Sequence, residues 1–199
     1  MSDIILKQGA RVLFPEDYEK MREHMPRYYQ LICDALLLSG MRPVEMSRFQ
    51  PSWYRASRRV LELPKDACRK ERCLYKTRTI KLSLRGCDAF DLLISEKTKF
   101  KRKEVFAYER IPERVAFRDA LKRYATLAGI GSDGITEKMF RKTLVSWLVA
   151  CYPEKQAYIQ ASMGHNQDTI VQNYLGIVFT RDQIDAIKSK YLYQWGELI

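Results

Sequence analysis

The chain has 199 residues, of which 46% are hydrophobic and 30% are charged, an ordinary composition for a globular protein. It is long enough to bury one core, so we expect a single domain, residues 1–199. Lys and Arg number 35 against 24 Asp and Glu, for a formal net charge of +11. This excess favours a polyanion as partner, nucleic acid first, over a merely basic soluble protein.

The sequence also argues against zinc sites, secretion and membrane spans. The five cysteines are odd in number and show no CxxC pair or Cys/His spacing that fits zinc, so we expect a reduced compartment and no metal. The N-terminus lacks the apolar core of a signal peptide. The longest purely apolar run, Ala35 to Leu38, is far shorter than the roughly 20 residues of a membrane-spanning helix. We therefore expect a soluble, cytoplasmic protein, associated with the nucleoid if it binds DNA.

Two helices are predicted in the first forty residues. Pro15, followed by two acidic residues, opens a charged helix that should stop near Pro26. From Arg27 the apolar residues recur at helical spacing, and Gly40 then stands where a C-terminal cap would. Arg42 is thus expected just beyond a buried helix and ahead of a second, short one.

A β-hairpin is predicted next, because residues 60–63 and 79–82 alternate between apolar and polar side chains. The segment between them, residues 65–78, is basic. Such a loop suits a ribbon that projects toward DNA, and it suits a solvated hairpin tip about equally well.

Beyond Leu84 the pattern is helical. Helices are expected near residues 87–95, 112–128, 136–150, 154–163, 168–174 and 181–193. Thr136 and Thr180 are candidate N-caps, and Thr180 with Gln183 has the form of a capping box. The predicted fold class is therefore mainly α with a small antiparallel β-sheet (α+β).

Metal-free cleavage of a phosphodiester needs a nucleophile, cations that neutralise the phosphorane, and an acid for the leaving oxygen. Four motifs of the chain offer such groups, namely Gly40-Met41-Arg42-Pro43-Val44-Glu45, Lys138-Met139-Phe140-Arg141, Gly164-His165, and Tyr174 nine positions after that histidine. Their order and separations resemble those of the tyrosine recombinases, or phage-type integrases, across residues 12–180. The resemblance implies the DNA breaking-rejoining catalytic fold of that family.

The resemblance also implies a role for each motif. Tyr174 would attack the scissile phosphate of double-stranded DNA, forming a 3′-phosphotyrosyl link and releasing a 5′-hydroxyl without cofactor, metal or ATP. Arg42 and Arg141 would hold the phosphate in their planar forks. His165 would donate to a non-bridging oxygen, and Glu45 would orient Arg42 from behind.

The lysines of the site are less clearly defined by the motifs. Lys138 stands where the family usually has histidine, as in some archaeal integrases and the related type IB topoisomerases. Lysine can donate to phosphate but is a poor general base near neutral pH, so deprotonation of Tyr174 would rely on the surrounding positive charge. The family's general-acid lysine lies on the hairpin and corresponds either to Lys70, ranked slightly first, or to Lys76. Predicted DNA-binding residues are Lys65, Arg69, Arg72 and Lys142.

The two ends of the chain extend the comparison. The family usually places a core-binding domain before the catalytic one, and the sequence offers no counterpart for it. Residues 181–199 form a tail helix whose apolar face either docks on a neighbouring copy, in a dimer or tetramer on DNA, or packs on its own domain. Besides an integrase, we consider a topoisomerase-like DNA-relaxing enzyme and a non-catalytic DNA-binding protein that keeps the fold.

Overall fold

A computed structural model describes residues 4–7, 9–67, 77–164, 179–195 and 197. Most of the expected hairpin loop and the helix expected over 168–174 lie outside these residues.

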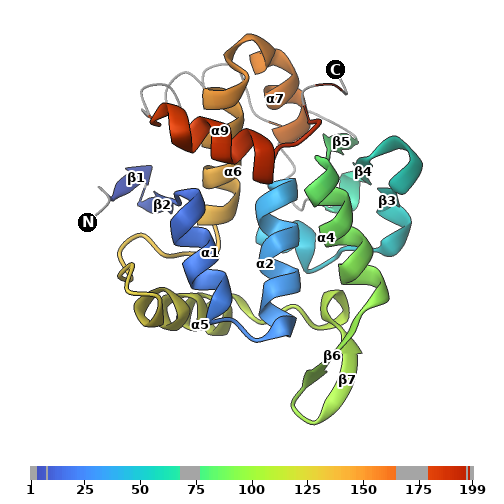
Figure 1. Ribbon diagram of the computed structural model, residues 1–199. Helices are drawn as coiled ribbons and strands as arrows, with labels where there is room; N and C mark the ends of the chain where they lie inside the picture. Colours follow the sequence, from blue (N-terminus) through green and yellow to red (C-terminus); the bar gives the residue numbers. More distant parts are fainter. Residues whose placement is uncertain (1–3, 8, 68–76, 165–178, 196, 198–199) are drawn as a thin grey trace.

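Helices make up most of the described structure (Figure 1). The α-helices are α1 (Pro15–Glu23), α2 (Arg27–Ser39), α3 (Pro43–Met46), α4 (Leu84–Ser95), α5 (Arg114–Leu127), α6 (Met139–Cys151), α7 (Gln156–Met163) and α9 (Arg181–Lys190). Short 3₁₀ helices are η1 (Pro51–Trp53), η2 (Ala56–Arg58), η3 (Lys65–Ala67), η4 (Ala107–Arg110) and η5 (Pro153–Lys155).

Three small antiparallel sheets accompany the helices. They comprise β1 (Ile5–Lys7) with β2 (Ala10–Val12), β3 (Tyr54–Arg55) with β4 (Val60–Leu63) and β5 (Arg78–Lys81), and β6 (Lys97–Phe100) with β7 (Lys103–Phe106). The pairing of β4 with β5, in which Val60 faces Lys81 and Leu63 faces Arg78, confirms the predicted hairpin. The other two hairpins and β3 were not predicted. The hairpin of β6 and β7 projects from the lower end of the domain in Figure 1.

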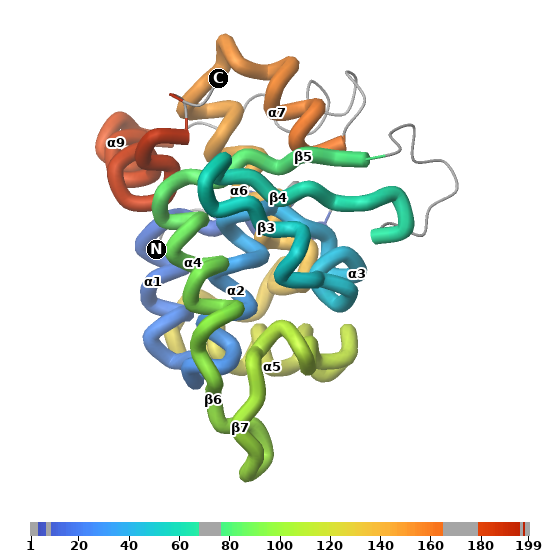
Figure 2. Tube along the Cα trace, turned by 90° about the vertical axis from the view of Figure 1, so that its right-hand side faces the viewer, coloured from blue at the N-terminus to red at the C-terminus, as the bar shows by residue number. Residues whose placement is uncertain are grey.

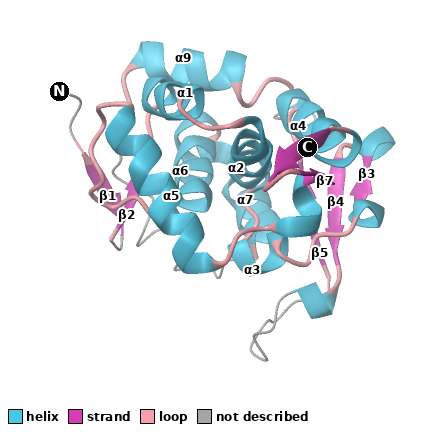
Figure 3. Ribbon diagram, turned by 90° about the horizontal axis from the view of Figure 1, so that it is seen from below, coloured by secondary structure: helices cyan, strands magenta, loops and turns pink. Residues whose placement is uncertain are grey.

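Helix α2 is the centre of the core. All its residues from Leu31 to Ser39 are buried, as the apolar spacing predicted, and α2 packs against α4 and α6 (Figures 1 and 3). Gly40 ends the helix in the left-handed conformation at φ 61°, where its N–H bonds to the carbonyl of Leu36. This C-cap turns the chain sharply at the point where Arg42 follows.

The helix ends differ from prediction in several places. Thr136 does not cap α6, because residues 136–138 form a turn and the helix begins at Met139 with Lys138 at its N-cap. Buried Glu137 holds that turn by pairing with Arg114 of α5. Helix α4 begins at Leu84, earlier than predicted, because Ser83 caps it by accepting from the N–H of Gly86. The capping box of Thr180 and Gln183 on α9 is confirmed.

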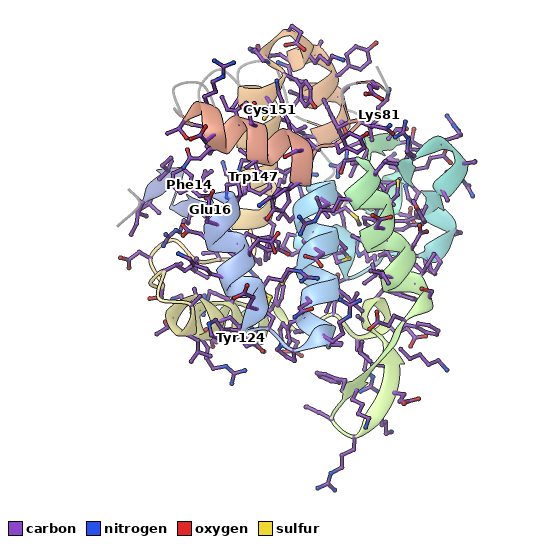
Figure 4. All side chains as sticks on the ribbon, in the orientation of Figure 1. Phe14, Glu16, Lys81, Tyr124, Trp147 and Cys151 are labelled. Carbon is purple, nitrogen blue, oxygen red and sulfur yellow. The ribbon has the colours of Figure 1, made fainter. Side chains whose placement is uncertain are left out.

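The C-terminal segment packs on its own domain. Ile187, Tyr191 and Leu192 are buried, and the Tyr191 hydroxyl donates to Glu19 of α1 at 2.6 Å. Trp147 of α6 lies in the interior of the domain (Figure 4). Its ring is 4.7 Å from that of Tyr191, and its N–H donates to the Leu13 carbonyl. Of the two alternatives for the tail, the structure has the intramolecular one. Docking on a neighbouring copy stays a prediction.

Among the described residues, no helix is long and apolar enough to cross a bilayer.

Candidate active site

The structure describes six of the predicted site residues. These are Arg42, Glu45, Lys65, Lys138, Arg141 and Lys142. The predicted nucleophile and phosphate-binding imidazole, both candidate general acids and two loop arginines lie outside the described residues; they are Tyr174, His165, Lys70, Lys76, Arg69 and Arg72.

Arg42 and Glu45 form a tight local unit at the start of α3. Arg42 is the N-cap of that single helical turn, and Glu45 stands three residues on, where a capping-box glutamate reaches back to the N-cap. One carboxylate oxygen of Glu45 accepts from the Arg42 backbone N–H at 2.6 Å, and the other accepts from Arg42 Nη1 at 2.8 Å. The contact expected between these side chains is therefore present, and it fixes the Arg42 guanidinium close to its own backbone.

Arg141 joins two helix ends from a buried position. It lies in the first turn of α6, donates from Nη1 to the carbonyl of Gly40 at 2.8 Å, and donates from Nη2 to the carbonyl of Met163. Gly40 ends α2 two residues before Arg42, and Met163 ends α7 just before the Gly164-His165 pair. Residues of two of the four sequence motifs, and the residue that directly precedes a third, thus meet around one guanidinium.

Arg78 is a member of this cluster that the sequence analysis missed. It opens β5, its side chain is only 9% exposed, and it donates from Nη2 to Glu45 Oε2 at 2.7 Å. Its Nη1 donates to the Met163 carbonyl at 3.2 Å. Two-residue alternation was the available signal, because Arg78 shares a strand face with buried Ile80.

Gly164 makes room for Arg78. It caps α7 in the left-handed conformation at φ 61°, and a Cβ at this position would lie 3.1 Å from Arg78 Cδ. A larger residue would be strained by the backbone and would press on the arginine. The glycine of the Gly164-His165 pair therefore has a steric reason in this fold.

The charges in the cluster are unbalanced. Burial raises the pKa of Glu45, but Arg78, the backbone N–H of Arg42, and the Arg42 and Arg141 guanidiniums together outweigh it and lower that pKa. Glu45 is thus a carboxylate at neutral pH. Because three guanidiniums surround one carboxylate, positive charges outnumber negative ones by two among these four side chains.

The predicted lysines lie at the margins. Lys138 is exposed at the N-cap of α6, one turn before Arg141, and half-buried Lys142 follows Arg141 on the same helix. Lys65 is exposed in η3, where the chain leaves β4 for the hairpin loop. Among the described residues, no three His, Cys, Asp or Glu side chains are grouped so that they could hold a metal ion.

Comparison with solved structures identifies the fold. The XerA recombinase is similar with a TM-score of 0.61 over 96% of this chain, at 15% sequence identity. A Tn1549 transposon integrase in complex with transposon right end DNA is similar with a TM-score of 0.62 over 94% of this chain, at 18% identity. The chain has the tyrosine recombinase fold.

The likeness to tyrosine recombinases is one of structure and is distant in sequence. Another structure of the Tn1549 integrase, with circular intermediate DNA, matches with a TM-score of 0.61 over 87% of this chain at 18% identity. The chain spans only 64–67% of the length of these three structures. No protein-family model matches the sequence, and no curated protein matches it either. The fold that the four motifs implied is confirmed.

Proposed function

We propose that this protein is a site-specific DNA recombinase that cleaves and rejoins DNA through a 3′-phosphotyrosyl intermediate, without metal or ATP. The observation that carries the proposal is the cluster of Arg42, Arg78 and Arg141 around a single carboxylate, Glu45, in which Arg78 and Arg141 are about 9% exposed and Arg42 is half-buried. Three guanidiniums gathered at one place attract an anion. A DNA phosphate supplies that anion.

Two of the arginines are suited to hold the phosphate as it reacts. Attack on a phosphodiester places additional negative charge on the non-bridging oxygens, and preorganised guanidiniums stabilise that charge without having to reorient. Arg42 is held in place by Glu45, and Arg141 by the carbonyls of Gly40 and Met163. The amides at the start of α6, where Arg141 lies, also favour an anion.

The remaining steps are assigned through the register of the motifs. Tyr174 loses its phenol proton to solvent, favoured by the surrounding positive charge, and the phenolate attacks the phosphorus as the 5′-oxygen leaves. One phosphoester bond thus replaces another, and the bond energy is kept for religation. His165 and Lys138 donate to the non-bridging oxygens. Lys70 or Lys76 gives the departing 5′-oxygen its proton.

Duplex DNA is the proposed partner. The net charge of +11 supports this, and the Tn1549 integrase structures that share the fold contain DNA. Because phosphate contacts dominate such binding, the affinity should fall steeply with salt. We also propose that two or four copies act together on DNA.

The test is covalent trapping on nicked suicide duplexes that tile the DNA flanking the coding sequence. Wild type should form an EDTA-resistant adduct, and Tyr174→Phe should form none while binding DNA with nearly unchanged affinity. Tyr193→Phe, which alters an exposed tyrosine, is the control and should cleave normally. An adduct that survives Tyr174→Phe would disprove the nucleophile. A metal requirement would disprove the mechanism.

One further assay separates recombination from relaxation. Lys138-x-x-Arg141 resembles the form found in type IB topoisomerases, so supercoiled plasmid should be included as a substrate. Relaxation without recombinant products would assign the protein to that activity instead.

A further inference from the structure

Four chain segments that are distant in sequence are joined into a ring by polar contacts, and the backbone from Gly40 to Arg42 closes it. Arg141 links the end of α2 to the end of α7, Arg78 links the end of α7 to α3, and Glu45 links Arg78 back to the segment that follows α2. We call this the arginine ring; its members are Gly40, Arg42, Glu45, Arg78, Met163 and Arg141.

We propose that Arg78 is a positioning residue for the reaction proposed above, on which this inference rests. It holds the Met163 carbonyl, where the segment carrying His165 and Tyr174 begins, in fixed relation to Glu45 and so to Arg42. Arg78 touches neither nucleophile nor phosphate in this assignment. It sets the distance between the groups that do.

The position of Arg78 in the chain makes this role specific. It opens β5, the strand that leads out of the loop containing the candidate acids Lys70 and Lys76. Strand β5 also packs beside α7, the helix that ends at Met163 (Figure 2). One guanidinium therefore ties the strand that follows the proposed acid to the helix that precedes the proposed nucleophile.

Stability alone explains Arg78 poorly. Its Nε is buried and has no hydrogen-bond partner among the described residues, which is a penalty that an apolar side chain would avoid. Replacing a buried ion pair by well-packed apolar residues is often neutral or stabilising. The arginine fork can bridge a carboxylate and a separate carbonyl in one fixed geometry, whereas lysine offers a point charge on a flexible stem.

The close approach of Gly164 supports the same role. Its missing side chain leaves Arg78 room beside the backbone of the segment that enters the proposed nucleophile region. The ring is therefore closed by steric fit as well as by hydrogen bonds.

The experiment compares Arg78→Ala and Arg78→Lys with wild type in single-turnover cleavage of the nicked duplexes at saturating protein. Arg55→Ala is the matched control, because Arg55 lies in the same sheet and pairs with Glu62 at 3.0 Å, but is half exposed and outside the ring. DNA affinity is measured in parallel by fluorescence anisotropy, and folding by circular dichroism and melting temperature. Arg78→Lys keeps the positive charge, so the test remains informative if Arg78→Ala does not fold.

Arg78→Ala should slow cleavage by about 10²-fold, as a misplacement of about 1 Å can, while DNA affinity changes less than about threefold. Arg78→Lys should be slowed by about tenfold or more with a melting temperature near wild type, because lysine cannot bridge both acceptors in the arginine geometry. Arg55→Ala should cleave at the wild-type rate.

Two results overturn the inference, and they differ. If wild type forms the Tyr174-dependent adduct and Arg78→Lys cleaves equally fast, Arg78 has no positioning role while the proposed function stands. If wild type forms no adduct and relaxes no plasmid, the proposed function fails, and the role of Arg78 fails with it.

Discussion

Replacing Gly40 by alanine tests the geometry on which the site depends. Gly40 has φ 61°, a conformation that adds roughly 1 kcal/mol or more for a residue with a side chain. An added Cβ would lie 2.9 Å from Met163 Sδ and 3.0 Å from Leu144 Cδ2. Met163 is 1% exposed, so its side chain is packed on all sides. Overpacking of this kind adds about 1–3 kcal/mol.

The total loss of unfolding free energy should therefore be about 3 kcal/mol, which for a domain of this size is about 6–12 °C in melting temperature. Urea unfolding at pH 7 measures it. Gly129→Ala is the matched control, because Gly129 has φ 71° but nothing within 4 Å of the position of a Cβ. Gly129→Ala should lower the unfolding free energy by the backbone strain alone, about 1 kcal/mol.

A third variant isolates the contact with Met163. In a Met163→Ala background the sulfur is absent, so Gly40→Ala should cost distinctly less than in wild type, a coupling that a double-mutant cycle measures. If Gly40→Ala and Gly129→Ala are equally destabilised, the close packing of the α2 end against α7 is wrong. The carbonyl geometry around Arg141 would then be wrong as well.

Three other predictions follow from separate features. Arg42→Ala and Arg141→Ala should each slow cleavage by about 10²-fold, because each removes a preorganised donor; a near-wild-type rate in single-turnover assays would exclude that arginine from the phosphate site. The pKa of Glu45 is lower in the folded state, so the stability it contributes is present above the unfolded pKa of about 4.3 and is lost as pH falls through the folded pKa. The unfolding free energy of Glu45→Gln should therefore fall less steeply below pH 5 than that of wild type. Equal slopes of unfolding free energy against pH, measured by urea unfolding, would contradict this. Arg102→Gly should raise the melting temperature by about 1–3 °C, because Arg102 has φ 70°, a conformation that glycine adopts without strain. Lys103→Gly, within strand β7, should lower it. Changes of the same sign would refute the turn geometry.

Local rules predicted the elements that depend on local contacts. The period of apolar residues located α2, and Gly40 ended it because the left-handed C-cap favours glycine. The hairpin of β6 and β7 was missed because its turn places Lys101 and Arg102 at positive φ, where rules expect Asn or Gly. The start of α6 was misjudged because residues 136–138 form a turn, in which buried Glu137 pairs with Arg114, a residue distant in sequence.

The candidate site shows the same division. The motifs singled out Arg42, Glu45 and Arg141, and the fold brings these side chains and the start of the Gly164-His165 pair together. Arg78 could not be separated from the neighbouring cations of the loop by charge alone. The Arg78 side chain points inward because β5 pairs with β4 and because the Glu45 carboxylate accepts its hydrogen bond.

The anchoring of the C-terminal segment has a kinetic consequence for assembly. Tyr191, Leu192 and Trp195 are core residues here, and their partners include Glu19 and the backbone of β5. If two copies traded these segments, each would first have to open part of its own core. The rate of such an exchange would be limited by local unfolding and would rise steeply with temperature. It would not be limited by the diffusion of an unpacked segment to a second copy.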